Sequence, residues 1–385
     1  MKTFNKQLET FEESIFATIS QKAHKVSAVN LGQGFPDFDG PSWLKELCKD
    51  SFDSDVVNIN QYAPSPGRIE LRASIADNFK EFYGEDFDAK DEVTVFNGAT
   101  EALFCSALAL LNAGDEVIVF EPFYDSYLAN IKLANATAKV VTLHAPEFRF
   151  KLEELEKAFS DKTKMIYLNS PHNPSGTVFT RAELEQISTL CKKWDVYVVS
   201  DEVYEHLTFD DHKHIPISTL PGMKERTITI SSMGKTFGFT GWKIGWALAP
   251  KELSHALRMV HQFNTFSVCH PIQLGISKGL KKLKDYLPEF KELYRKKREL
   301  LLDGLESSGF SPIKPQGTYF TLCKIPNEQM NDVQYCYHLI EKYKVATIPP
   351  SSFYLESKDG QKYVRFCFAK SNEVLLEAIK NLQAK

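Results

Sequence analysis

Residues 231–246, SSMGKTFGFTGWKIGW, place a lysine in a tight turn between two short β-type segments. The first segment is TITIS (227–231), and the second lies within GWKIGWALA (241–249). Lys235 follows the small residues of a Ser-x-x-Gly turn, so its amine can point into a cleft and form a Schiff base with an aldehyde. Because no long helical pattern separates the two segments, the second strand could enter a sheet antiparallel to the first.

Upstream of this turn, short β-rich strands alternate with helical segments. The helical segments are 97–111, 125–134, 151–159 and 180–193. The strands are EVTVF (92–96), EVIVF (116–120), AKVVTL (138–143), KMIYLN (164–169) and VYVVS (196–200). Together with the two strands around Lys235, this alternation predicts an α/β fold with a mainly parallel, seven-stranded, doubly wound sheet.

The regular alternation of strands and helices ends near residue 280. A charged helical stretch (284–308) is followed by short strands in TYFTLCKI, KVATIPP and YVRFCFA, and by a closing helix (371–383). This pattern is typical of a smaller α+β domain. We expect a large domain at 40–280 and a small domain made of 1–39 together with 281–385. Helices are also expected at 8–24 and 68–83.

Composition narrows the class of protein. The chain has 385 residues, of which 43% are apolar and 25% are charged, as in a soluble globular protein with a sizeable core. A net charge of −4 argues against a nucleic-acid partner or an acidic membrane. The longest apolar stretch, 102–111, is too short to span a bilayer. Seven scattered cysteines without a C-x-x-C pair indicate buried thiols in a reducing, cytoplasmic compartment.

The ten histidines show no metal-like spacing, so no metal is expected, and His212 and His214 are expected to be solvated in an acidic loop. The spacing of the glycines also departs from two nucleotide-binding motifs. Gly234-Lys235-Thr236 resembles the end of a phosphate loop, but Thr229 stands where that loop needs glycine. Gly32-Gln33-Gly34 lacks the third glycine of a dinucleotide fingerprint.

Four strands end in polar groups, and ligands of open α/β sheets gather beyond the carboxyl ends of the strands. These strand ends are Gly98–Thr100, Asn169–Asn173, Asp201–Tyr204 and Ser231–Lys235. Asp201 could hold the ring nitrogen of pyridoxal phosphate in its protonated form, or it could cap a helix. The four strand ends together predict a single ligand site.

Four segments resemble fold-type-I, pyridoxal-phosphate-dependent aminotransferases of class I/II. They are SPHNPSGTVF (170–179), SDEVYEHLTF (200–209), SSMGKTFGFTGWKIGW (231–246) and RFCFAK (365–370). Within that family, SIFATIS, LGQGFPDFDGP, NQYAP, GATEAL and YDSY resemble bacterial methionine aminotransferases, with kynurenine and glutamine aminotransferases next. The resemblance runs in order from about residue 14 to the C-terminus.

The resemblance implies a role for each matching position around the cofactor ring. Lys235 forms the Schiff base and moves the proton between Cα and C4′, and Asp201 pairs with the pyridinium. Asn173 and Tyr204 donate to the phenolate oxygen. Tyr124 stacks on the ring in preference to Phe123.

The phosphate has its own set of expected partners. Ala99 and Thr100 offer backbone N–H groups at a helix start, which is a natural anion site. Ser232 and Lys243 complete the cradle; many relatives carry arginine at the second position, which would add a bidentate fork. Tyr62 is expected to reach the phosphate from a partner subunit, which implies a homodimer with a shared active site.

Substrate contacts are implied as well. Arg365 resembles the α-carboxylate clamp of the family, although an arginine in a strand could also simply lie on the surface. Asn173 is expected beside the substrate, and Gly34 lets a loop close on it. Relatives specific for aspartate carry an arginine in the stretch aligned with 261–268, where this chain has no arginine or lysine.

An apolar side-chain pocket is therefore expected, with walls chosen among Phe16, Tyr62, Tyr127, Phe353 and the segment 263–266, which includes Phe263 and Phe266. Such a pocket suits methionine, aromatic amino acids, glutamine or kynurenine as donor to a 2-oxo acid in ping-pong chemistry. A cysteine-conjugate C–S β-lyase would share every cofactor residue and remains an alternative. A non-catalytic binding protein of the same fold is the alternative of another class.

Overall fold

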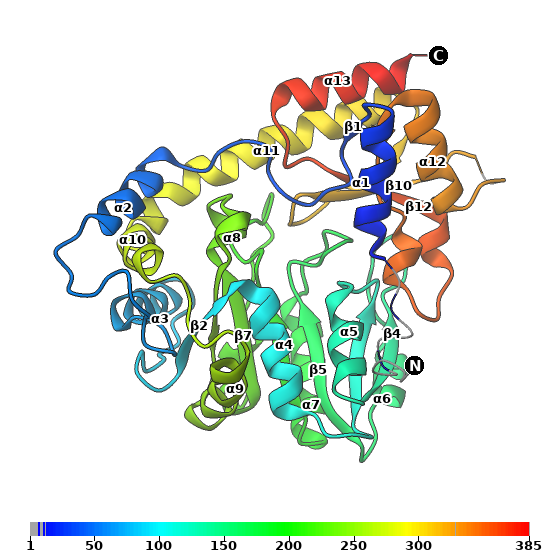
Figure 1. The fold of residues 1–385 in the computed structure, drawn as a ribbon. Coiled ribbons are helices and arrows are strands. Elements are labelled where there is room, and N and C mark those ends of the chain that lie inside the picture. The colour runs from blue at the N-terminus through cyan, green and yellow to red at the C-terminus, as the bar shows by residue number, and fades with distance from the viewer. Residues whose placement is uncertain (1–6, 8–10, 12, 328, 385) are drawn as a thin grey trace, which may run out of the picture.

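The computed structural model describes residues 7, 11, 13–327 and 329–384. Figure 1 shows a central sheet with helices around it in the lower part of the molecule, and a helical layer above. The expected helix at 8–24 lies partly outside the described residues; the structure has α1 at Ile15–Lys25.

A seven-stranded sheet forms the centre of the fold, in the order β2-β8-β7-β6-β5-β3-β4. Its strands are β2 (Val93–Asn97), β3 (Glu116–Glu121), β4 (Thr137–Thr142), β5 (Thr163–Asn169), β6 (Tyr197–Asp201), β7 (Thr227–Ser232) and β8 (Ile244–Leu248). Only β8 runs antiparallel to its neighbours, β2 and β7. The predicted α/β class, the seven strands and the antiparallel entry of the strand after Lys235 are thus confirmed.

Alternating side chains of the strands supply a core on each face of the sheet. In β3, Val117 and Val119 belong to one buried cluster, whereas Ile118 and Phe120 belong to another. Successive residues of a strand point to opposite faces, and strands covered on both faces read as continuous apolar runs. This is why the β-type segments of the sequence carry so few polar residues.

Helices cover both faces of this sheet (Figure 1). Those between the strands are α4 (Gly98–Leu110), α5 (Ser126–Leu133), α6 (Leu152–Ala158), α7 (Arg181–Lys193) and the short α8 (Met233–Thr236). Those around the β2 edge are α2 (Ser42–Phe52), α3 (Ile69–Tyr83), α9 (Lys251–Asn264) and α10 (His270–Leu280). Short 3-10 turns are η2 (Ile217–Thr219), η3 (Lys224–Arg226) and η4 (Thr240–Trp242).

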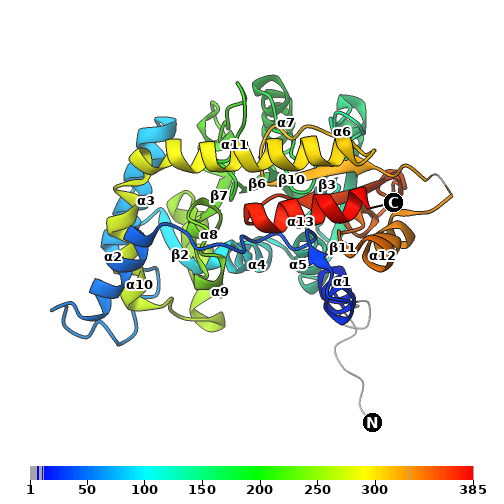
Figure 2. The same cartoon turned by 90° about the horizontal axis from the view of Figure 1, so that it is seen from above.

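The remaining elements form the upper layer. They are β1 (Val29–Asn30), α11 (Leu283–Ser307), β9 (Ser311–Pro312), β10 (Phe320–Lys324), α12 (Asp332–Tyr343), β11 (Val345–Ala346), η5 (Pro350–Phe353), η6 (Asp359–Lys362), β12 (Tyr363–Cys367) and α13 (Asn372–Gln383). Seen from above, α11 and α13 lie side by side (Figure 2).

The N-terminal segment joins this layer through β1, which pairs in parallel with β11 (Val29 opposite Val345). This pairing places the N-terminal segment beside the C-terminal elements of the upper layer. The domain limits themselves, 1–39 with 281–385 against 40–280, stay a prediction.

Two smaller expectations are wrong. Cys269 is exposed, whereas the other six cysteines are buried. The side chain of His214 is only 2% exposed, because its Nε2 lies 2.7 Å from a buried Glu202 carboxylate, while His212 is exposed as expected. Across the described part of the chain, no helix is long and apolar enough to cross a membrane.

Candidate active site

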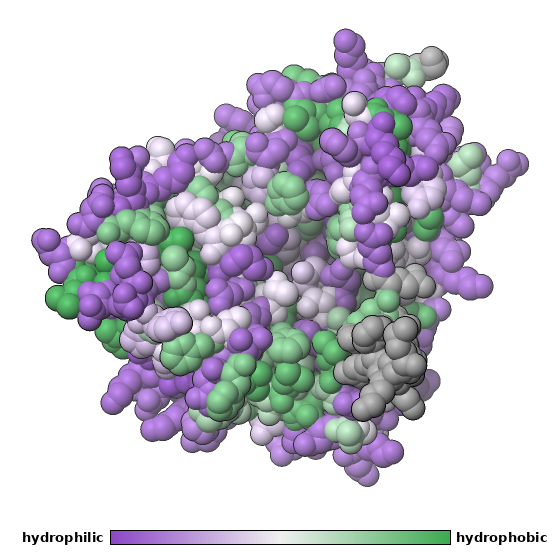
Figure 3. Space-filling model, viewed as in Figure 1, coloured by the Kyte–Doolittle hydropathy of each residue, from purple (hydrophilic) through white to green (hydrophobic). Residues whose placement is uncertain are grey.

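A cavity of about 280 Å³ opens where the carboxyl ends of the central strands meet the upper layer. The face in Figure 3, viewed as in Figure 1, is hollowed in its middle. All the predicted site residues except Tyr62 line this cavity: Gly34, Ala99, Thr100, Tyr124, Asn173, Asp201, Tyr204, Ser232, Lys235, Lys243 and Arg365. The cavity therefore brings together the strand ends that the sequence singled out.

Lys235 lies in α8, immediately after β7, and its amine points toward the loop at Gly34. Nζ donates to the Tyr319 hydroxyl oxygen at 2.8 Å and to the Gly34 carbonyl at 3.2 Å. The Tyr319 hydroxyl in turn donates to the same carbonyl at 2.6 Å. Burial lowers the pKa of Lys235 to about 8. A lysine with this pKa is neutral in about a tenth of the molecules at pH 7, far more than an exposed lysine.

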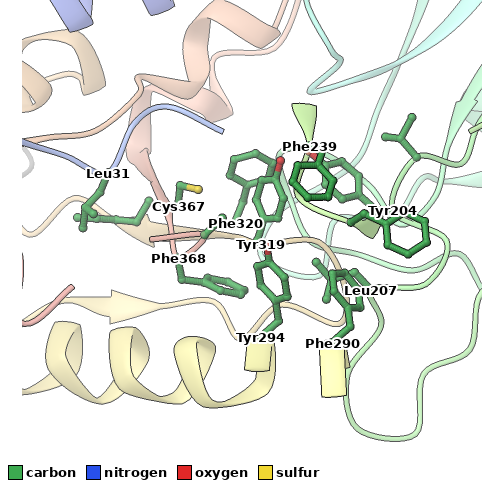
Figure 4. Packing of buried hydrophobic residues seen from close by; sticks show 14 of the residues in the cluster. Leu31, Tyr204, Leu207, Phe239, Phe290, Tyr294, Tyr319, Phe320, Cys367 and Phe368 are labelled. Atoms are coloured by element: carbon green, nitrogen blue, oxygen red, sulfur yellow. The ribbon is translucent and has the colours of Figure 1, made fainter. Parts of the chain in front are cut away.

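Tyr319, which accepts from this amine, belongs to a cluster of buried aromatic rings that includes Tyr204 and Tyr294 (Figure 4). Tyr319 packs edge-on against Tyr204, with ring centroids 5.2 Å apart, and stacks on Tyr294. These rings are buried, so the Tyr319 hydroxyl is held in place. Sequence reasoning missed Tyr319; its position in TYFTLCKI, at the start of a buried strand, was the available signal.

Asp201 ends β6 and is 4% exposed. Burial raises its pKa to about 6, although hydrogen bonds from Tyr127 and from the Val203 backbone and the charge of Lys235 act in the opposite direction. The Tyr127 hydroxyl donates to Oδ2 at 2.7 Å. Asp201 caps none of the described helices. Such a carboxylate is costly to ionise without a cation nearby, so it suits a cationic ligand atom.

The N-terminus of α4 faces the same cavity. Asn97 makes no side-chain capping bond, so the first N–H groups of the helix, including those of Ala99 and Thr100, are left for a ligand. Gly245 permits the close approach of β8, because a Cβ there would lie 2.4 Å from Ala99 N. Lys243 adopts a left-handed backbone (φ 53°) that brings its Nζ within 3.4 Å of Thr100 Oγ1. Strained residues of this kind concentrate at functional sites.

Arg365 comes from β12 and is 1% exposed, so it is not a surface arginine. Nη1 donates to Asn173 Oδ1 at 3.0 Å and Nη2 to the Gly32 carbonyl at 2.9 Å. The guanidinium lies 4.1 Å from the centre of the Phe320 ring. Its Nε has no hydrogen-bond partner, and no acidic side chain of the described residues forms an ion pair with it. A buried charge without a counter-ion, facing a cavity, is suited to an anionic ligand.

The orientation of Asn173 follows from this arginine. Because Oδ1 accepts from the guanidinium, Nδ2 is turned away and remains able to donate. The backbone N–H of Asn173 donates to Asn169 Oδ1 at 2.8 Å, which fixes the turn after β5. Tyr124 also lines the cavity, and burial raises its pKa to about 12. Phe123 is buried and does not line the cavity.

Of the residues expected to wall the side-chain pocket, only Phe16 lines the cavity; Tyr62, Tyr127, Phe353 and the segment 263–266 do not. Tyr127 lies behind Asp201, and Phe353 packs against the Arg365 guanidinium at 5.3 Å. Phe35 and Phe320 line the cavity and were not foreseen.

Tyr62 and Phe266 lie on the surface with ring centroids 5.3 Å apart, and Tyr62 is 80% exposed. Phe263, at the end of α9, is 87% exposed. Neither the segment 263–266 nor Tyr62 lines the cavity of its own chain. A role for these residues toward a partner subunit stays a prediction.

Comparison with known proteins agrees with this geometry. The profile of the family "Aminotransferase class I and II" matches residues 26–382. A kynurenine–oxoglutarate transaminase of Dictyostelium discoideum is 38% identical, over 98% of this chain and 95% of that protein. A methionine aminotransferase of Escherichia coli is also 38% identical, over 96% and 95% of the two chains.

Among solved structures, an N-succinyldiaminopimelate aminotransferase from Mycobacterium tuberculosis superposes with a TM-score of 0.94 at 37% identity, over 99% of both chains. The similarity of sequence and fold extends over nearly the whole length of the protein. The chain therefore belongs to the class I and II aminotransferases, a family of pyridoxal-phosphate-dependent enzymes.

Proposed function

We propose that this enzyme moves the α-amino group of a neutral amino acid to a 2-oxo acid, with pyridoxal phosphate bound at Lys235. The observation that carries the proposal is the buried Arg365 guanidinium, which forms no ion pair with an acidic side chain of the described residues and shares one cavity with the Lys235 amine and the Asp201 carboxylate. An amino acid and its 2-oxo acid both carry the α-carboxylate that such a guanidinium binds.

The residues present fit the cofactor. Its phosphate matches the uncapped N-terminus of α4 with Thr100, Ser232 and Lys243 around it. Its ring nitrogen matches Asp201, a buried carboxylate that lacks a cation in direct contact. Pyridoxal phosphate supplies an aldehyde that condenses with amines and a pyridinium ring that withdraws electrons from Cα.

Lys235 is suited to hold the aldehyde and then to carry a proton. Its lowered pKa leaves enough neutral amine near pH 8 to act as nucleophile and as base toward Cα. When the amine is free, Tyr319 and the Gly34 carbonyl accept its two N–H bonds. The nitrogen lone pair is then left to accept the proton.

Asp201 keeps the ring nitrogen protonated if it is itself ionised. The hydrogen bond from Tyr127 stabilises the ionised form and fixes the orientation of the carboxylate. Asn173, through Nδ2, and Tyr204 are proposed to donate to the phenolate oxygen of the ring. Arg365 orients the substrate, because two parallel N–H bonds to the α-carboxylate fix the position of Cα.

We propose a neutral donor side chain because the cavity offers no spare cation. Its basic residues are Lys235, Lys243 and Arg365, and each has a proposed partner in the cofactor or the α-carboxylate. His261, in the stretch where relatives specific for aspartate carry arginine, is fully buried against Glu101. Phe16, Phe35 and Phe320 supply apolar surface instead. The names of the relatives point to methionine and kynurenine as first candidates.

We also propose that the enzyme works as a homodimer in which Tyr62 reaches the phosphate in the partner's site. The exposure of Tyr62, Phe263 and Phe266 on one chain supports this, since large apolar side chains rarely stay in water together. A cytoplasmic location is proposed because all seven cysteines are free thiols.

The testing experiment is a panel of amino donors with a fixed 2-oxo acid acceptor, in which the new amino and oxo acids are both quantified. We expect methionine and aromatic amino acids to exceed aspartate in kcat/KM. Release of pyruvate and ammonia from a cysteine conjugate without acceptor would instead favour a C–S β-lyase. A cofactor-loaded protein that turns over neither would refute both activities and leave a binding protein.

A further inference from the structure

A buried pair of titratable groups, outside the cavity lining, lies next to the proposed phosphate site, where α4 packs against the end of α9. Glu101, in the first turn of α4, has its Oε1 2.8 Å from Nδ1 of His261. The side chains are 5% and 0% exposed. On its other side, His261 Nε2 lies 3.0 Å from the backbone carbonyl of Ser65.

The hydrogen bonds of the pair determine its charges. The Ser65 carbonyl can only accept, so Nε2 of His261 carries a proton. Nδ1 faces a carboxylate that already accepts from several other groups. These other donors are Asn97 N at 2.6 Å, Asn97 Nδ2 at 3.3 Å, Asn264 Nδ2 at 3.3 Å and Thr265 Oγ1.

A carboxylate surrounded by donors favours its ionised form. Burial alone would raise the pKa of Glu101, but the hydrogen bonds from His261, Thr265 and the Asn97 backbone hold that pKa below its ordinary value. The proton between Glu101 and His261 thus belongs to the ring. The pair is a carboxylate and an imidazolium with no net charge. The Phe96 ring, 5.0 Å away at its centroid, is the apolar neighbour of the imidazolium.

The pair lies at the N-terminus of α4, so its net charge affects the binding of an anion there. Glu101 bonds to the backbone N–H of Asn97, which opens the same helix turn whose next N–H groups face the cavity. An uncompensated carboxylate there would repel a phosphate, and burial would leave that repulsion poorly screened by salt. The carboxylate also accepts the Asn97 N–H and so stabilises the first turn of α4. A cation that balances its charge lets this turn keep the carboxylate and still bind an anion.

We propose that His261 is a positioning residue for cofactor binding, which supplies the counter-charge that allows a phosphate to bind above Glu101. This inference rests on the proposed binding of pyridoxal phosphate at α4. It assigns to His261 an effect through Glu101, without contact to the cofactor. It also predicts that the effect concerns the phosphate and spares the pyridine ring.

The experiment uses the full-length apoprotein and a double-mutant cycle. Binding of pyridoxal phosphate and of pyridoxal, which lacks the phosphate, is titrated by absorbance for the parent, His261→Gln, Glu101→Gln and the double variant. His255→Gln, an exposed histidine on the same helix α9, is the matched control.

We expect His261→Gln to weaken pyridoxal phosphate about tenfold or more, because one buried charge is left unbalanced. Pyridoxal should be affected far less. The double variant should bind pyridoxal phosphate nearly as well as the parent, and Glu101→Gln alone should bind it at least as well. His255→Gln should bind both ligands as the parent does.

Three results would overturn the inference. They are an equal loss for both ligands in His261→Gln, which indicates a purely structural role; no recovery in the double variant; and no loss at all. If His261→Gln does not fold, Glu101→Gln together with 15N-histidine NMR decides. The parent must show a buried histidine protonated on both ring nitrogens that loses one proton in Glu101→Gln. A parent that binds no pyridoxal phosphate would refute the proposed function itself, whereas binding without this charge dependence would refute only the role of His261.

Discussion

Replacing Arg365 probes the carboxylate clamp, and the structure gives the size of the effect. Arg365→Lys keeps a positive charge but lacks the two parallel N–H groups of the guanidinium. At least one charge-assisted hydrogen bond to the substrate carboxylate therefore disappears. Such a bond contributes about 1.5–3 kcal/mol, which corresponds to a loss of about 10- to 150-fold in kcat/KM. Arg365→Met removes both bonds, so the loss should reach about 10²- to 10⁴-fold.

The fold should tolerate the change to methionine. The guanidinium is buried without an acidic partner among the described residues, so removing it also removes an uncompensated charge. Against this gain, Asn173 Oδ1 and the Gly32 carbonyl each lose a donor. The two effects oppose each other, and the melting temperature of Arg365→Met should stay near that of the parent.

The assay compares phenylalanine with phenethylamine, which is the same donor without its carboxylate. The parent should strongly prefer phenylalanine, and Arg365→Met should lose most of that preference while its slow rate with phenethylamine stays unchanged. Arg298→Lys is the matched control: this arginine is equally buried, but it is paired with Asp210 and does not line the cavity. A loss of equal size for both donors in Arg365→Met would refute the clamp.

Three further predictions concern the cofactor site. Asp201→Asn should weaken pyridoxal phosphate by about 1.5–3 kcal/mol, and it should slow deuterium exchange at Cα by more, because the lost interaction strengthens as charge develops; equal exchange rates in the two proteins would contradict this role. Burial raises the pKa of Asp201 to about 6, so the carboxylate is mostly neutral below that pH. The affinity of the apoprotein for pyridoxal phosphate should therefore rise between about pH 5 and 7 in an absorbance titration. In Asp201→Asn this rise should be flattened. Mixed subunits of inactive Lys235→Ala and inactive Tyr62→Ala should recover some activity, since one hybrid site has both residues intact; no recovery despite proven subunit exchange would count against a shared site.

Much of the fold could be predicted because its determinants are local. Each strand of the sheet is an apolar run bounded by turn residues, and the polar strand ends at Asp201 and Lys235 follow from the geometry of parallel sheets. The antiparallel entry of β8 could also be predicted, because no long helical pattern separates it from β7. The structure has only the four-residue helix α8 and a 3-10 turn between the two strands.

The parts that were missed depend on packing between distant segments. Tyr127 was expected in the pocket wall, yet its hydroxyl is used by Asp201, 74 residues away in the chain. Phe320 reaches the site from β10, which is paired with β12, and Tyr319, directly before that strand, contacts Lys235 from a position 84 residues away in the chain. His214 was expected in solvent, but a fold-specific contact buries it against Glu202. Composition and spacing carry no signal for such long-range pairs.

The most direct test of the account is the identity of the lysine that holds the cofactor. The protein is loaded with pyridoxal phosphate, reduced with borohydride, digested, and analysed by peptide mass spectrometry. We predict a phosphopyridoxyl group on Lys235 alone, and its disappearance when methionine is added before reduction. A modified lysine elsewhere in the chain, or a cofactor that stays on Lys235 in the presence of every amino donor tried, would contradict it.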